Sequence, residues 1–144
     1  MEHTEISPNI GVADQEAVAR PLAPPQYDTI VSVGYDDKPP TTSSTGDEFW
    51  FPDGDHDYSV FKSAVDYVIK QINTGNSVLV HCRSGRSRST AIVITTLAIT
   101  ENLSLDEAFN RVKDKHPLTD PATPIRDSME RYTDDTLDDY RKYL

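Results

Sequence analysis

The sequence predicts an α/β domain in which a central, mostly parallel sheet is flanked by helices in three layers. Short β-branched, apolar runs such as 77–81 alternate with segments such as 59–73, where apolar residues recur every three or four positions. Alternating strands and helices favour parallel pairing through crossover connections. The 144 residues suit a single domain over residues 1–144, with residues 1–5 expected as a flexible tail.

The first half of the chain contains three candidate strands. Residues 6–13 alternate weakly and include Pro8, which suits an edge strand. Residues 27–33 are apolar enough for a buried strand, and residues 48–51 form a third, short run. Between the first two, residues 14–22 predict a short helix that ends at a group of prolines.

The middle of the chain predicts a helix, the central strand and an internal helix. Ser59 is expected to cap the first helix and Gly75 to end it. The strand over residues 77–81 follows. Residues 91–99 are apolar on nearly every side of a helical wheel, which indicates an internal helix that begins near Ser87.

Two further helices are expected near the end of the chain. Residues 104–107, Ser-Leu-Asp-Glu, form a capping box that opens the first. It should close at His116, which we interpret as a cap and not as a catalyst. Thr123 and Pro124 should begin the last helix.

The composition limits the partners of the protein. A net charge of -10 argues against a basic face for nucleic acid. No apolar run has the length that crossing a bilayer requires. The polar, acidic start shows no targeting signal. We therefore expect a cytoplasmic monomer that binds neither nucleic acid nor membrane.

The acidic surface leaves two interpretations open. At about 1 M salt the Debye length falls to about 3 Å, so repulsion of phosphorylated partners would vanish beyond direct contact. This favours the hypothesis of a salt-rich cytosol. An ordinary acidic soluble protein is the alternative.

The loop between the central strand and the internal helix carries the chemistry. Residues 82–88, called the phosphate loop below, can turn their amides inward because Gly85 allows a sharp turn. The helix N-terminus adds partial positive charge, and Arg88 can close over an anion as a two-pronged donor. Cys82 would then lie at the bottom of a cup for a phosphate.

Such surroundings activate a cysteine. A free thiol titrates at about 8.5, but a helix N-terminus and a nearby cation can lower this to roughly 3.5–7.5. Cys82 would then be a thiolate nucleophile placed under the phosphate. The alternative, a structural buried cysteine, fits the flanking Gly85 and Arg88 poorly. Because Cys82 is the single cysteine, an internal disulfide is excluded.

Residues 81–89, His-Cys-Arg-Ser-Gly-Arg-Ser-Arg-Ser, resemble the signature His-Cys-x-x-Gly-x-x-Arg-Ser/Thr of the cysteine-dependent protein tyrosine phosphatase superfamily. The Ser-Arg-Ser ending looks most like the dual-specificity branch. The resemblance implies a phosphatase-like domain, without cofactor or metal, that hydrolyses phosphate monoesters through a phosphocysteine intermediate. It implies phosphorylated proteins, or small phosphates, as substrates, with both phosphotyrosine and phosphoserine or phosphothreonine accepted.

A second segment, residues 50–57, is called the acid loop below. Its Trp-Phe-Pro-Asp start resembles the family's loop that carries the general acid, and Asp53 stands 29 positions before Cys82. Asp55 and Asp57 on the same turn remain alternatives, and two of the three would be a solvated turn or helix cap. His56 is expected at the surface and not as a metal ligand, because no second His or Cys stands at a useful spacing.

The resemblance also assigns supporting roles. Ser89 would hydrogen-bond the sulfur, and His81 would brace the loop without touching substrate. Arg83 and Arg86 occupy variable positions and, at the rim of the cup, would favour substrates with more than one anionic group. Many relatives carry Pro-Asn-x-Gly-Phe before the last helix, where its Asn braces the catalytic loops. Residues 123–125 replace it here, and what braces these loops stays open.

Three rival functions remain. The same chemistry could act on a phosphoinositide, a nucleotide or an RNA 5′-phosphate. A phosphate-binding module without turnover is a second rival, although Cys82, Arg88 and several candidate acids are retained. A sulfurtransferase is the third, and Arg88, Ser89 and the upstream acid favour phosphate over it.

Overall fold

The computed structural model describes residues 3–14, 27–33 and 48–141, with side chains placed up to residue 137. These residues form five strands and four helices: β1 Thr4–Ser7, β2 Ile10–Ala13, β3 Thr29–Val33, β4 Glu48–Phe49, α2 Tyr58–Asn73, β5 Val78–His81, α3 Arg88–Thr100, α4 Leu105–Lys115 and α5 Thr123–Arg141. Thr4 and Glu5, expected in a flexible tail, instead form the first half of β1.

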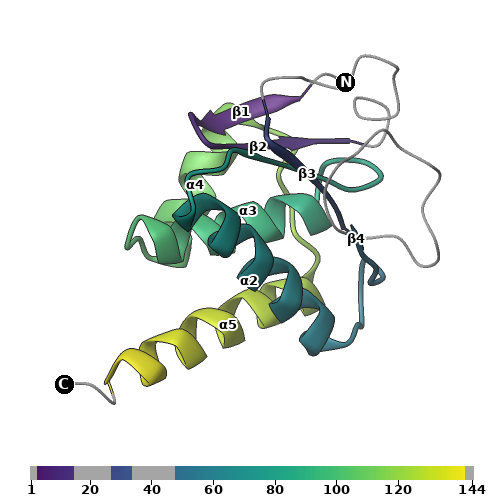
Figure 1. Ribbon diagram of the computed structural model, residues 1–144. Coiled ribbons are helices and arrows are strands. Elements are labelled where there is room, and N and C mark those ends of the chain that lie inside the picture. Colours follow the sequence, from purple (N-terminus) through teal and green to yellow (C-terminus); the bar gives the residue numbers. More distant parts are fainter. Residues whose placement is uncertain (1–2, 15–26, 34–47, 142–144) are drawn as a thin grey trace.

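The strands make one sheet in the order β1-β2-β5-β3-β4. Only the β1–β2 pair among the described strands is antiparallel, and the other three pairs are parallel. The predicted mostly parallel sheet is confirmed. β5 occupies its centre, so the phosphate loop leaves the sheet from the middle strand (Figure 1).

The prediction of a single edge strand over residues 6–13 is wrong. The chain turns at Pro8 and Asn9, so β1 and β2 form a hairpin. Pro8 stands in this turn, where its missing N–H removes no hydrogen bond from the sheet. β2 is buried along its whole length between β1 and β5.

Both faces of the sheet are buried. On one face, alternate residues of the inner strands pack with residues of all four described helices, and Figure 1 shows these helices on one side of the sheet. The strand residues on this face are Ile10, Val12, Val31, Val33, Val78 and Val80. Ala13, Ile30 and Leu79 occupy the opposite face and are also buried, with Tyr27 packed against them. Apart from Asp14, the helix expected over residues 14–22 lies outside the described residues.

The internal position of α3 is confirmed. Every residue from Ser89 to Ala98 is buried, and α3 packs against the sheet and the other three described helices. Such burial fixes the start of α3 directly behind the phosphate loop. The N-cap is Ser87, as the sequence predicts.

The ends of the other helices agree with the sequence in most places. Ser104 and Glu107 form the expected capping box of α4, and Thr123 begins α5. Gly75, with a φ of 92°, follows the end of α2 in the left-handed conformation that glycine tolerates. None of the described helices combines the length and the hydrophobicity that crossing a membrane requires.

Candidate active site

The side chain of Cys82 points into the loop at the end of β5. Cys82 is 2% exposed, and its Sγ accepts a hydrogen bond from the Gly85 N–H at 3.2 Å. The Ser89 Oγ lies 3.1 Å from the same sulfur. Both groups can donate to a negatively charged sulfur, which is the environment that a thiolate nucleophile needs.

The Gly85 turn is held from outside the loop. Gly85 has a φ of 68°, a conformation in which a side chain would be strained. Its carbonyl oxygen accepts a hydrogen bond from His116 Nε2 at 2.6 Å. The next carbonyl, of Arg86, accepts from the Asp120 N–H at 2.7 Å. These contacts hold the loop in the shape that aims the Gly85 amide at the sulfur.

Arg88 connects the phosphate loop to the acid loop. Its Nη1 donates to the carbonyl oxygen of Phe51 at 3.1 Å, and the side chain is half-buried. Phe51 itself is buried in the main core, which anchors the acid loop. A planar guanidinium can hold this carbonyl and still offer further N–H groups to a phosphate.

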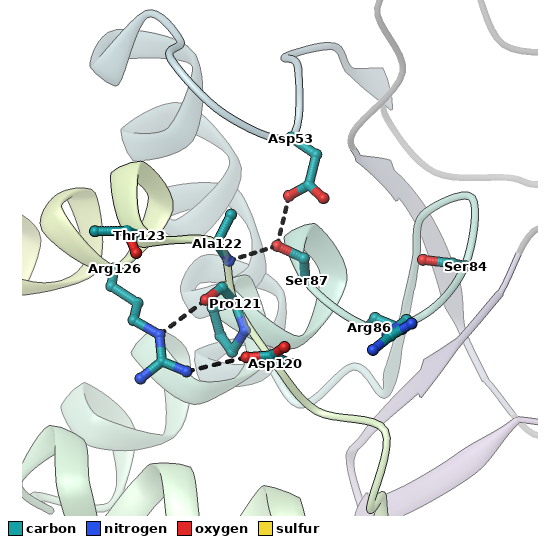
Figure 2. A pocket seen from close by; sticks show the side chains of 9 residues that line it. All are labelled: Asp53, Ser84, Arg86, Ser87, Asp120, Pro121, Ala122, Thr123 and Arg126. Carbon is teal, nitrogen blue, oxygen red and sulfur yellow. Dashed lines mark hydrogen bonds and ion pairs between the residues drawn. The ribbon is translucent and has the colours of Figure 1, made fainter.

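Asp53 is the candidate acid that the structure places beside the phosphate loop. Its Oδ1 accepts a hydrogen bond from the Ser87 Oγ at 2.5 Å. Asp53 also lines a cavity of about 660 Å³ together with Ser84, Arg86 and Ser87 (Figure 2). Its carboxylate is exposed and therefore accessible to a substrate.

The other two candidate acids are placed differently. Asp57 is the N-cap of α2, a position that the sequence assigned to Ser59. Its Oδ1 accepts from the Ser59 N–H at 2.9 Å and from the Ser59 hydroxyl at 2.8 Å, and these hydrogen bonds lower the pKa of Asp57. Asp55 is exposed and makes no hydrogen bond to the phosphate loop within the described ranges.

The interpretation of His56 as a surface residue is wrong. The ring is half-buried, and Nδ1 donates to the Gly54 carbonyl at 2.7 Å. Nε2 lies 2.7 Å from the Ser128 Oγ on α5. The ring centroid is 5.4 Å from that of Phe51. His56 thus connects the acid loop to α5. The two partners are 72 residues apart in the sequence, so no local pattern predicted this contact.

His81 ends β5 on the sheet face opposite to the helices. Its Nε2 lies 2.5 Å from the Ser32 Oγ of β3. Burial lowers the pKa of His81 to about 4, while a hydrogen bond with the Cys82 backbone acts in the opposite direction. At pH 7 the ring is therefore neutral. This placement suits a residue that holds the strand end and not one that meets substrate.

His116 does more than cap α4. It is the C-cap residue, as predicted, but its side chain is buried and only 3% exposed. In addition to Gly85, the ring contacts the Thr4 Oγ1 of β1 through Nδ1 at 2.9 Å. The sequence missed this link, because the two partners lie 31 and 112 residues away.

Arg83 and Arg86 are both exposed, and only Arg86 of the two lines the cavity beside Asp53. On the far side of this cavity, Arg126 donates from Nε to the Pro121 carbonyl at 2.8 Å and pairs with Asp120 (Figure 2). Within the described residues, no three His, Cys, Asp or Glu side chains are grouped to hold a metal ion.

Comparison with known sequences identifies the family. Residues 46–135, more than half of the chain, match the family model described as dual specificity phosphatase, catalytic domain. Dual specificity protein phosphatase 1 of Homo sapiens is 40% identical over 63 residues, 44% of this chain and 17% of that protein. The Arabidopsis thaliana dual specificity protein phosphatase PHS1 is 36% identical over 63 residues, 44% of this chain and 7% of that protein. The chain therefore spans less than a fifth of the length of these two relatives.

Solved structures share the fold. Human DUSP28 superimposes with a TM-score of 0.80 at 20% identity, covering 95% of this chain and 96% of that one. The human tyrosine phosphatase-like serine/threonine/tyrosine-interacting protein gives a TM-score of 0.80 at 20% identity, covering 94% and 98%. These structures share the fold, and the matched family model over residues 46–135 shows that the chain belongs to the family of dual specificity phosphatase catalytic domains.

Proposed function

We propose that this chain hydrolyses phosphate monoesters on proteins, at phosphotyrosine as well as phosphoserine and phosphothreonine, through a phosphocysteine intermediate. One observation carries the proposal. The Gly85 N–H of the phosphate loop and the Ser89 hydroxyl in the first turn of α3 both contact the Cys82 sulfur, and the Ser87 hydroxyl reaches Asp53 on the acid loop. The phosphate loop thus contacts both Cys82 and Asp53, which supports their roles as nucleophile and acid.

In the first step the Cys82 thiolate attacks phosphorus in line with the ester oxygen. The S–P bond forms as the P–O bond breaks. Arg88 and the main-chain amides of residues 83–88 hold the equatorial oxygens, where negative charge is spread in the transition state. Asp53, protonated, gives its proton to the leaving oxygen.

In the second step water attacks the phosphocysteine. Asp53, now a carboxylate, takes a proton from that water, so one group serves as acid and then as base. The S–P bond breaks and inorganic phosphate leaves. The Ser89 hydroxyl, 3.1 Å from the sulfur, donates to the departing thiolate and makes it a better leaving group.

The cellular setting belongs to the same proposal. A thiolate nucleophile needs a compartment that keeps Cys82 reduced, which supports a cytoplasmic location. The net charge of -10 argues against nucleic acids and anionic membranes as partners. The matched family model supports phosphorylated proteins as substrates. We propose that the chain acts as a monomeric domain over residues 1–144.

The test is phosphate release from an aryl phosphate and from phosphotyrosine, phosphoserine and phosphothreonine peptides. We expect release from all of them, with Cys82→Ser as the control that lacks the nucleophile. Inositol phosphates, nucleotides and RNA 5′-phosphate complete the panel. A clear preference for one of these would overturn the proposal that phosphorylated proteins are the substrates. Phosphate release no greater than that of Cys82→Ser would contradict the proposed activity and favour a phosphate-binding module without turnover.

A further inference from the structure

The hydroxyl of Ser87 is used in an unusual way. Ser87 is the N-cap of α3, where a serine side chain commonly accepts a hydrogen bond from an N–H of the first turn. Here the side chain makes no capping hydrogen bond. It lies 2.5 Å from Asp53 Oδ1 and 2.8 Å from the Ala122 nitrogen instead, and the residue is 5% exposed.

Three segments meet at this hydroxyl (Figure 2). Asp53 belongs to the acid loop, Ser87 to the phosphate loop, and Ala122 to the chain just before α5. Ala122 contributes only its main-chain N–H, because its side chain has no polar atom. Ser87 therefore supplies the side chain that joins the two catalytic loops to the start of α5.

The direction of both hydrogen bonds follows from the groups involved. The Ala122 N–H can only donate, so the Ser87 oxygen accepts from it. A hydroxyl has one hydrogen, and Ser87 donates it to Asp53 Oδ1. While this hydrogen bond is kept, Oδ1 stays an acceptor when the carboxyl is protonated. The acidic proton is then confined to Oδ2.

We infer that Ser87 is a positioning residue for the general acid. Its hydroxyl fixes Asp53 Oδ1 and so presents the proton on Oδ2 to the leaving oxygen. This inference rests on the proposed function, in which Asp53 is the acid. Ser87 acts through Asp53, and its effect is expected in the proton-transfer part of the first step.

The experiment compares two aryl phosphates in the full chain, one with a good leaving group, p-nitrophenol, and one with a poor one, phenol. Ser87→Ala should lower kcat for phenyl phosphate by about tenfold or more, because general acid catalysis matters most for the poor leaving group. The p-nitrophenyl phosphate rate should change by less than about threefold. Ser87→Thr, which keeps the hydroxyl, should restore the wild-type ratio of the two rates.

A double-mutant cycle separates positioning from general loosening of the loop. In an Asp53→Ala background, adding Ser87→Ala should change the rate ratio no further, since the acid is already absent. Thr123→Ala is the matched control, because Thr123 lines the same cavity without contacting Asp53 through a hydrogen bond, and it should keep the wild-type ratio. Equal losses for both substrates, or a further change of the ratio in the Asp53→Ala background, would overturn the inference.

A second variant decides the matter if Ser87→Ala does not fold. Ala122→Pro removes the N–H that directs the Ser87 hydrogen toward Asp53. It should shift the ratio in the same direction by a smaller factor, and an unchanged ratio would contradict the inference. Failure of the proposed function looks different, because the wild-type chain would then release no phosphate above Cys82→Ser from either substrate.

Discussion

The guanidinium of Arg88 performs two tasks in this site. One nitrogen donates to the Phe51 carbonyl at 3.1 Å. A guanidinium has five N–H donors in a planar fork, which can also bind two phosphate oxygens side by side. A lysine offers its three N–H donors from one point, so it cannot reproduce the planar, two-pronged contact with two phosphate oxygens. We expect Arg88→Lys to lower kcat for p-nitrophenyl phosphate by at least about 100-fold. Arg111→Lys, on the exposed surface of α4, is the control, and near-normal rates in Arg88→Lys would rule out the two-pronged clamp.

Two of the candidate acids, Asp53 and Asp55, give distinct expectations. Asp53→Ala should lower turnover of phenyl phosphate by about 10²–10⁴-fold and affect p-nitrophenyl phosphate far less. Asp55→Ala should leave both rates near those of the wild-type chain. Asp55 is exposed, and within the described residues it makes no hydrogen bond to the phosphate loop. Both expectations are measured by steady-state rates of the two variants on a series of aryl phosphates whose leaving groups range from good to poor. The reverse outcome would move the acid role to Asp55.

Sequence reasoning reached these groups only in part, for a physical reason. Cys82 and Arg88 lie in one short loop, where spacing alone fixes their neighbours. Asp53 could not be separated from Asp55 and Asp57, since all three share a turn whose geometry depends on distant contacts. One such contact is Ser87 to Asp53, and its 34-residue separation leaves no trace in local patterns.

Between elements, His116 joins the end of α4 to β1 and to the phosphate loop. His116→Ala would leave the buried Gly85 carbonyl without this donor, so we expect a loss of about 1–3 kcal/mol in the free energy of unfolding and slower alkylation of Cys82 by iodoacetamide. Urea unfolding and alkylation rates at pH 7 measure the two effects. Thr4→Ala keeps the Gly85 contact and is the matched control. Wild-type alkylation in His116→Ala would contradict the link to the loop.

The elements themselves were largely predictable because their signals are local. The capping box at Ser104 and the apolar wheel of α3 both led to correct helices. The hairpin at Pro8 was missed because β1 and β2 are only four residues each, too short for a clear period. The cap of α2 was misplaced by two residues, since Asp57 and Ser59 are both good N-caps and end up bonded to each other.

For the folded chain, the low pKa of His81 sets a pH dependence of stability. Burial lowers the pKa of His81 from its usual value of 6.5 to about 4, so the unfolded state binds more protons between these two pH values. Stability is therefore full above about pH 6.5 and decreases as the pH falls toward 4, by up to about 3 kcal/mol. Urea unfolding of the wild-type chain and of His81→Gln at pH 7 and pH 5 measures it. An equal decrease in both would exclude His81 as the source.

The charge of the molecule gives the last prediction. The chain carries a net charge of -10, and exposed carboxylates crowd α5 at Asp127, Glu130, Asp134 and Asp135. Like charges repel in the folded chain, and at about 1 M salt the Debye length of about 3 Å screens them. The free energy of unfolding in urea should thus be higher in 1 M KCl than in dilute buffer, as a salt-rich cytosol would require.

A matched variant locates the source of this effect. Asp134→Asn with Asp135→Asn removes two negative charges from α5 and should reduce the difference between the two salt conditions. Urea is the suitable denaturant, because guanidinium chloride is itself a salt and would screen the same charges. Equal stability of the wild-type chain in dilute buffer and in 1 M KCl would mean that the acidic surface is that of an ordinary soluble protein, since its charges would then not oppose folding.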